Sequence, residues 1–141
     1  MKNELTRSEE GTASLAEGLA RGFRGGEVVL LFGELGAGKT AFVRGLARGL
    51  DADPEQVCSP TFVLLTSYAG RLTLHHADLY RLAGDAAAAE LGLDELPGED
   101  GVLAIEWAEK LGPLSWPEEL HVRIEHAGDD HRRVQVEERS R

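Results

Sequence analysis

The segment Gly33-Glu34-Leu35-Gly36-Ala37-Gly38-Lys39-Thr40 constrains this chain more than any other part of its sequence. It matches G-x-x-x-x-G-K-[ST], a loop whose backbone N–H groups surround phosphate oxygens while Lys reaches the β- and γ-phosphates and the hydroxyl residue contacts Mg²⁺. An apolar run at residues 27–32 precedes the loop, and apolar residues follow it at helical spacing: Phe42, Val43, Leu46, Ala47 and Leu50. In this arrangement a buried strand leads through a glycine loop into a helix, and the N-terminus of that helix points at a bound anion. We therefore predict that the chain binds a nucleotide.

We expect the phosphates to contact the loop and the first residues of the helix, namely Glu34, Leu35, Gly36, Ala37, Gly38, Lys39, Thr40 and Ala41. Guanine-specific P-loop proteins carry an Asn-Lys-x-Asp element, and the only asparagine in this chain is Asn3. ATP is therefore the predicted nucleotide, with Mg²⁺.

The remaining pattern predicts an α/β protein with a mixed sheet. Residues 63–68 and 72–77 alternate around a turn and predict a hairpin, residues 102–105 predict a buried strand, and residues 120–124 and 134–136 predict a second hairpin. An N-terminal helix is expected after a capping box from Thr6 to Glu9. We predict a P-loop NTPase-like three-layer fold, with a parallel core and antiparallel hairpins, in a single domain spanning residues 1–141. Gly45 and Gly49 within the loop helix are expected at close packing or fraying positions.

Two acidic residues end predicted strands. Glu106 directly follows residues 102–105, and Asp78 closes the first hairpin. Ligands of a parallel core lie beyond the C-terminal ends of its strands, and nucleotide hydrolysis needs carboxylates for Mg²⁺ and for the attacking water. We predict Glu106 and Asp78 as catalytic residues and, with Thr40, as metal ligands. The alternatives are a surface glutamate at a strand end and an aspartate that caps a turn.

Thr61 and Trp107 are further candidates. Pro60 restricts Ser59 to extended backbone and so restrains the Thr61 hydroxyl, which favours a catalytic switch residue that senses the γ-phosphate. The alternative for Thr61 is the start of a strand. Trp107, beside Glu106, is predicted to contact the nucleotide base or a partner, and the alternative is a core tryptophan.

The histidine and cysteine residues show no pattern typical of a metal site or a nucleophile. His75 and His76 are adjacent in a predicted strand and therefore point to opposite faces. Cys58 is the single cysteine and fits a small buried apolar residue. Because no internal disulfide can form, this cysteine content agrees with a reducing compartment.

Charge and hydropathy exclude several classes of function. The net charge of −10 disfavours strong direct nucleic-acid binding. The sequence contains no apolar run of membrane-spanning length and no signal-peptide pattern in its first residues. We expect a cytoplasmic protein with no membrane partner.

Four motifs occur in the order and approximate spacing of the bacterial TsaE (YjeE) family: residues 33–40, Ser59–Phe62, His76–Leu82 and Ile105–Trp107. The chain resembles that family over nearly its whole length, and the three downstream motifs are far more specific than the phosphate loop. Glu34, Ala77 and Ala108 stand where the family commonly has Asp, Phe and Pro. These differences affect local packing and remove no charged or hydroxyl group from the predicted site.

The resemblance implies a small P-loop ATPase that helps make threonylcarbamoyladenosine, a modified base beside the anticodon of tRNAs that read codons beginning with A. It implies partnership with the TsaD and TsaB proteins, where TsaD with TsaB transfers the threonylcarbamoyl group and ATP hydrolysis by the TsaE-like subunit resets their complex. By resemblance, Lys39 and Thr40 hold phosphate and Mg²⁺, and Thr61 belongs to a switch segment. Asp78 and Glu106 then lie near metal and water, with Trp107 beside the nucleotide. Contact with tRNA would fall mainly to the partners, in agreement with the acidic charge.

Two other functions fit the same loop. A small-molecule or nucleoside kinase would need an arginine-rich lid and an acceptor pocket, for which no long segment remains. A nucleotide-gated interaction module would bind ATP without significant turnover.

Overall fold

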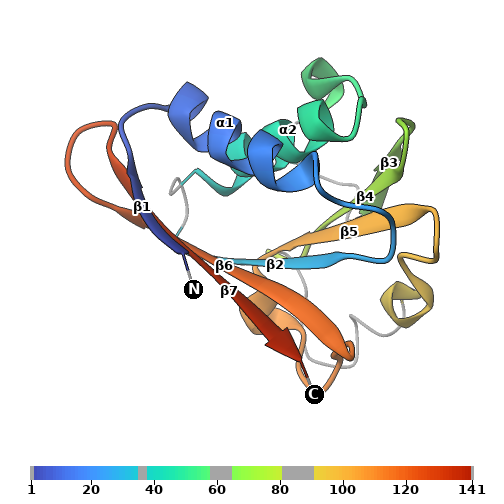
Figure 1. The fold of residues 1–141 in the computed structure, drawn as a ribbon. Coiled ribbons are helices and arrows are strands. Elements are labelled where there is room, and N and C mark those ends of the chain that lie inside the picture. Colours follow the sequence, from blue (N-terminus) through green and yellow to red (C-terminus); the bar gives the residue numbers. More distant parts are fainter. Residues whose placement is uncertain (1, 35–37, 58–64, 81–90, 141) are drawn as a thin grey trace.

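The computed structural model describes residues 2–34, 38–57, 65–80 and 91–140. Seven strands form one sheet in the order β1-β7-β6-β2-β5-β4-β3 (Figure 1). They are β1 (Lys2–Thr6), β2 (Val28–Phe32), β3 (Leu65–Tyr68), β4 (Thr73–Asp78), β5 (Gly101–Glu106), β6 (Glu118–His126) and β7 (Arg132–Ser140). β2 runs parallel to β5 and β6, and β4 runs parallel to β5. The pairs β3–β4, β6–β7 and β1–β7 are antiparallel, so the predicted α/β class, mixed sheet and two hairpins are confirmed.

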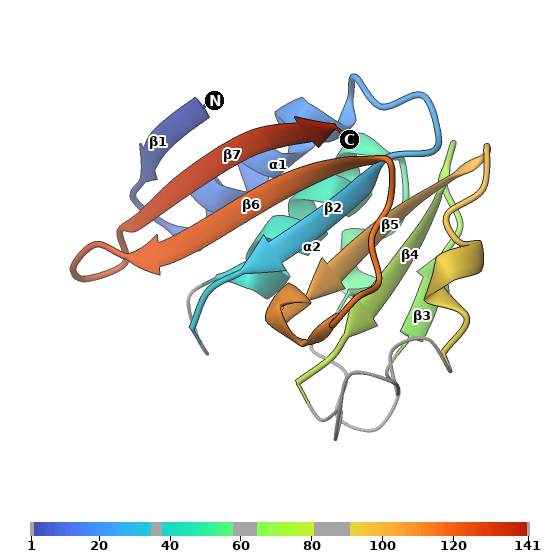
Figure 2. The ribbon, with the colours of Figure 1, turned by 90° about the horizontal axis from the view of Figure 1, so that it is seen from below.

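The sheet is covered on both faces near its centre. Helices α1 (Glu9–Ala20) and α2 (Lys39–Gly49) lie on one face (Figure 1). The short 3₁₀ turns η2 (Leu93–Glu95) and η3 (Ala108–Lys110), with the coil after η3, lie on the other (Figure 2). A third 3₁₀ turn, η1 (Pro54–Gln56), follows α2. Successive residues of β2 therefore enter different apolar clusters, with Val29 and Leu31 under the helices and Val28 and Leu30 on the opposite side.

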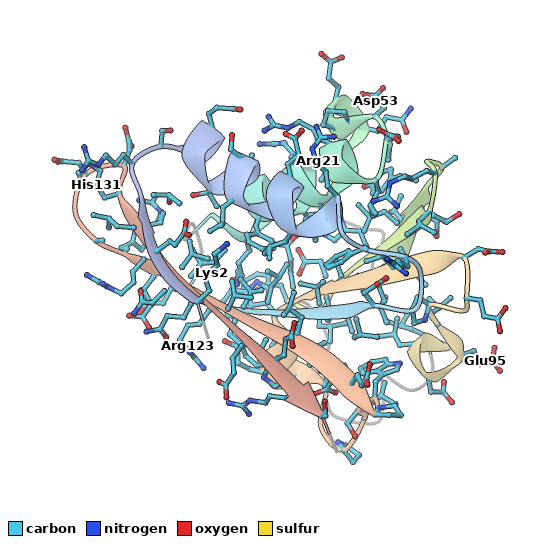
Figure 3. All side chains as sticks on the ribbon, in the orientation of Figure 1. Lys2, Arg21, Asp53, Glu95, Arg123 and His131 are labelled. Carbon is cyan, nitrogen blue, oxygen red and sulfur yellow. The ribbon has the colours of Figure 1, made fainter. Side chains whose placement is uncertain are left out.

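Polar and charged side chains such as Asp53, Glu95 and His131 project outward from this core (Figure 3). Within the described ranges, no helix is long and apolar enough to cross a membrane.

Helix α2 packs against α1 through two glycines. A Cβ atom on Gly45 would lie 2.0 Å from the carbonyl oxygen of Ala13, and one on Gly49 would lie 2.6 Å from the Cβ atom of Ala20. The close-packing interpretation of both residues is therefore correct, and their low helix propensity is the cost of bringing the two backbones together. Arg71 links the C-terminal ends of α1 and α2, because it donates hydrogen bonds to the carbonyl groups of Ala20 and Gly49.

The N-terminal segment differs from the prediction. Residues 2–6 form strand β1, which pairs with β7, although no strand was predicted for this segment. Thr6 is not the helix cap, because it ends β1 and its hydroxyl group lies 2.7 Å from that of Thr12. Ser8 caps α1 instead, since its hydroxyl oxygen accepts a hydrogen bond from the Gly11 N–H at 3.0 Å.

Candidate functional site

The start of α2 faces the C-terminal end of the parallel strands. Gly38 precedes the helix with φ of 106°, a left-handed conformation that glycine adopts without strain, and no side chain caps the helix there. The first-turn N–H groups of α2 therefore have the arrangement that binds anions. Leu35, Gly36 and Ala37 of the predicted cradle lie outside the described residues.

Lys39 is buried at this helix start, with 4% of its surface exposed. Its Nζ atom donates a hydrogen bond to the carbonyl oxygen of Gly33 at 2.7 Å and lies 3.5 Å from the centre of the Trp107 ring. Burial lowers the pKa of the Lys39 ammonium group, and the carboxylates of Glu109, Glu106 and Asp78 partly oppose that shift. The protein thus holds a desolvated cation beside the glycine loop.

Glu106 connects the end of β5 to the start of α2. The Thr40 hydroxyl lies 3.3 Å from one carboxylate oxygen of Glu106, Oε1, and 3.5 Å from the other, Oε2. Glu106 is 3% exposed, which excludes the alternative of a surface glutamate. Helix α2, where the predicted phosphate site begins, therefore contacts the end of β5 through the side chains of Thr40 and Glu106.

Asp78 joins the same group through the sheet. The parallel register of β4 and β5 places Asp78 directly beside Glu106. The Asp78 carboxylate is buried and accepts a hydrogen bond from the Tyr80 N–H at 3.0 Å, so it also makes the turn contact considered as its alternative. Burial raises the pKa of the Asp78 carboxyl group, and the nearby charge of Glu106 raises it further against the Tyr80 hydrogen bond.

His76 belongs to this cluster, and the sequence analysis did not identify it. Its side chain is completely buried, and Nε2 lies 2.6 Å from Oε2 of Glu106. His75 points to the other side of the strand, where its Nδ1 lies 2.8 Å from the Ser67 hydroxyl oxygen. The opposite orientation of the two histidines follows from strand alternation, but the pairing with Glu106 depends on the β4–β5 register, which no local signal reveals.

Trp107 is half-buried and has a left-handed backbone conformation, with φ of 59°. Its indole contacts the Lys39 ammonium group on one side, and the Tyr80 ring lies at a centroid distance of 5.1 Å. Trp107 also packs against the apolar cluster on the face opposite the helices. The core alternative is therefore correct for part of the ring, while the rest borders the loop.

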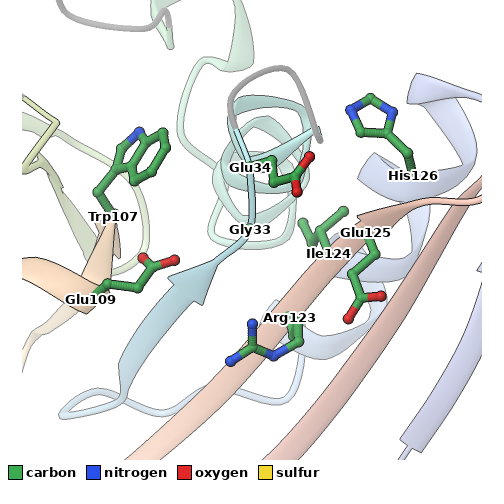
Figure 4. A pocket seen from close by; sticks show the side chains of 8 residues that line it. All are labelled: Gly33, Glu34, Trp107, Glu109, Arg123, Ile124, Glu125 and His126. Carbon is green, nitrogen blue, oxygen red and sulfur yellow. The ribbon is translucent and has the colours of Figure 1, made fainter.

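A pocket of about 500 Å³ opens beside the loop. Gly33 and Glu34 lie at its middle, with Trp107 and Glu109 on one side and residues of β6 on the other (Figure 4). Ala41 faces elsewhere: it is buried and lines a separate hollow of about 370 Å³ with residues of α1 and β7. Thr61 and the rest of the Ser59–Phe62 motif lie outside the described residues, so the role of Thr61 stays a prediction.

The site therefore combines a lysine, a hydroxyl group and two carboxylates within one end of the sheet. Hard oxygen ligands of this kind suit Mg²⁺, which commonly takes one or two protein carboxylates and completes its coordination with phosphates and water. The described residues contain no cluster of three histidine, cysteine or acidic side chains arranged to enclose a metal ion. These residues therefore suit a metal ion that is also bound by a phosphate better than one that is bound by protein side chains alone.

Comparisons with known proteins show a family that covers most of the chain. The family model "Threonylcarbamoyl adenosine biosynthesis protein TsaE" matches residues 6–134. A Treponema pallidum tRNA threonylcarbamoyladenosine biosynthesis protein TsaE is 46% identical over 107 residues, which cover 76% of this chain and 78% of the relative. The protein of the same name from Aquifex aeolicus is 38% identical over 138 residues, covering 96% of each chain.

A solved structure shares the fold. The crystal structure of Bacillus subtilis YdiB superposes with a TM-score of 0.78 and 33% sequence identity, and the match covers 99% of this chain and 86% of that one. The similarity therefore extends over the whole sheet and both helices.

Proposed function

This chain belongs to the TsaE family of threonylcarbamoyl adenosine biosynthesis proteins, and from that membership we propose that it is an ATP-hydrolysing subunit in the formation of threonylcarbamoyladenosine in tRNA. Its relatives are named for that biosynthesis. Residues 1–141 act in this proposal as one P-loop domain, in the cytoplasm and with no membrane partner.

One observation carries the proposal: Thr40 at the start of α2 lies 3.3 Å from Glu106 at the end of β5. In phosphoryl-transfer sites of this class, the loop hydroxyl and a strand-end carboxylate share the Mg²⁺ ion. Asp78, adjacent to Glu106 in the sheet, supplies a second carboxylate. We infer that Thr40, Glu106 and Asp78 would hold Mg²⁺, which when bound would neutralise negative charge on the phosphates of the nucleotide.

The chain's own groups have separate roles in the proposed hydrolysis. The N–H groups from Glu34 to Ala41 bind phosphate oxygens, and Lys39 leaves Gly33 and Trp107 to contact the β- and γ-phosphates. Glu106 accepts a hydrogen bond from the water that attacks the γ-phosphorus, the bond to the β–γ bridging oxygen breaks, and ADP and phosphate are the products. Thr61 senses the γ-phosphate, and Trp107 borders the nucleotide.

The partners follow from the family and from charge. We propose that ATP hydrolysis resets a complex of TsaD and TsaB between turnovers, and that tRNA is bound mainly through those proteins. The net charge of −10 supports an indirect role with tRNA, because the chain as a whole repels a phosphate backbone.

Phosphate release from Mg²⁺-ATP, measured with the full chain alone and with TsaD and TsaB, tests the proposal. We expect release that increases with both partners present. Stoichiometric transfer of phosphate to a small acceptor would instead show a kinase, and ATP binding without release under any condition would show a gated binding module. In cells depleted of the protein, nucleoside mass spectrometry of tRNA is expected to show loss of threonylcarbamoyladenosine.

A further inference from the structure

His76 is the most deeply buried polar side chain of the site, with no surface exposed. It lies on β4, which runs beside β5 (Figure 1). The parallel register places His76 opposite Ala104, two residues before Glu106 on β5. The resulting contact from Nε2 to Oε2 of Glu106 is 2.6 Å. This is a short hydrogen bond inside the core, where solvent does not compete for either group.

The other ring nitrogen of His76 indicates where the imidazole hydrogen lies. Nδ1 is buried and has no hydrogen-bond partner among the described residues. The carboxylate of Glu106 is an acceptor, so Nε2 must carry the hydrogen that forms the 2.6 Å contact. The centre of the Tyr68 ring lies 6.3 Å from that of the His76 ring, and the two rings are tilted relative to each other. Hydrogen on Nε2 accounts for the one side-chain hydrogen bond that His76 makes within the described residues.

That hydrogen bond restrains the catalytic carboxylate. Glu106 has rotatable side-chain bonds, and side chains from two different elements contact its carboxylate: His76 on β4 binds Oε2, and Thr40 on α2 lies closer to Oε1. In the proposed function the Thr40 hydroxyl would also contact Mg²⁺, whereas Glu106 is the only side-chain hydrogen-bond partner of His76 among the described residues. We propose that His76 is a positioning residue that holds the Glu106 carboxylate in the orientation needed for water activation. The inference rests on the proposed ATP hydrolysis for its catalytic consequence.

Two substitutions separate positioning from simple core filling. His76→Gln retains an N–H at a reach similar to that of Nε2, while His76→Leu retains apolar volume and removes the donor. We expect His76→Leu to lower kcat for Mg²⁺-ATP by about 10- to 100-fold, as for other residues that orient metal-site ligands, with KM nearly unchanged. His76→Gln should restore most of the rate. Equal rates for wild type and His76→Leu, or equal losses in both variants, would overturn the inference.

The chain supplies a matched control in His75, the neighbouring histidine on the opposite face of β4. His75→Leu should leave kcat unchanged. A double-mutant cycle with Glu106→Gln gives the sharper result, because a residue that acts through the carboxylate adds no further loss once the carboxylate is gone. Independent, multiplying losses would identify His76 as a core residue only.

A spectroscopic measurement on the unaltered chain keeps the inference testable if His76→Leu does not fold. Imidazole ¹⁵N shifts of the nucleotide-free protein should show a hydrogen on Nε2 of His76, and hydrogen on Nδ1 alone would overturn the inference. If the wild-type chain hydrolyses no ATP with its partners, the proposed function fails and the catalytic role of His76 fails with it. An active wild type with an equally active His76→Leu variant overturns only the inference.

Discussion

The two halves of the sheet bury different kinds of residue. In the parallel half (β2, β4 and β5), all six residues of β5 are buried. The ends of β4 and β5 and the start of α2 hold four polar or charged side chains with at most 6% exposure: His76, Asp78, Glu106 and Lys39. In the antiparallel ribbon (β1, β6 and β7), only alternate residues such as Val134 and Val136 are buried, and charged side chains face outward. One half therefore carries buried charge that costs stability, and the other supplies an amphipathic surface that stabilises the sheet edge. Substitutions in the parallel half should change activity, and those in the ribbon should change stability alone.

The largest effect is expected for Lys39→Ala in the parallel half. The variant loses at least two charge-assisted hydrogen bonds to phosphate at about 1.5–3 kcal/mol each, which corresponds to about 100-fold or more in ATP affinity. Calorimetric titration with Mg²⁺-ATP measures this loss. Lys2→Ala, in the ribbon and 51% exposed, is the control and should bind ATP normally. Unchanged binding by Lys39→Ala would remove the lysine from the proposed phosphate site.

Glu106→Gln should separate binding from chemistry. The amide keeps the size of the side chain but cannot accept a proton or stabilise the attacking water, so kcat should fall by about 100-fold or more, with ATP affinity largely retained. Single-turnover phosphate release and ATP titration give the two values. Glu138→Gln, exposed on β7, should behave as wild type. Equal loss of binding and turnover would make Glu106 a structural residue.

A substitution in the ribbon tests the other side of the comparison. Val134 is fully buried on β7, and Val134→Ala should lower the free energy of unfolding by about 2 kcal/mol through lost burial and a small cavity. Urea unfolding measures the change, and kcat for ATP should stay at the wild-type value in buffer without denaturant. If kcat falls although the Val134→Ala variant is fully folded, the ribbon also affects the geometry of the ATP site.

The smallest effect concerns the pH dependence of stability at Asp78. Because the folded-state pKa of this carboxyl group is raised above its ordinary value of 3.8, the folded protein keeps the proton more tightly than the unfolded chain does. The free energy of unfolding contributed by Asp78 therefore falls as pH rises from 3.8 through the raised pKa. Asp78→Asn should raise the Tm of the nucleotide-free protein at neutral pH, and the gain should shrink toward the acid end of that range. Asp100→Asn, at an exposed position, should show no such trend.

The same contrast explains what the sequence reveals. In the parallel half, β2 and β5 are continuous apolar runs and β2 leads into the glycine loop, so β2, α2 and β5 are predictable, as is the approach of Asp78 and Glu106 at the strand ends. Strand β1 is not predictable, because Lys2–Thr6 has one buried residue and its pairing with β7 joins the two ends of the chain. His76 was missed for a similar reason: its contact with Glu106 depends on non-local register.

The contact between Gly45 and Ala13 has a consequence for the phosphate end of α2. The helix is a stiff rod, and Gly45 lies five residues after Thr40 on it. A side chain at position 45 would force the two helices apart, since its Cβ atom would meet backbone at 2.0 Å, and such a displacement would carry Lys39 and Thr40 away from Glu106. Helix α1 supplies none of the proposed catalytic groups. Its contact with Gly45 nevertheless sets the distance between the Thr40 hydroxyl and the Glu106 carboxylate. Chemistry at one end of the molecule depends on the absence of a single methyl group at an interhelical crossing.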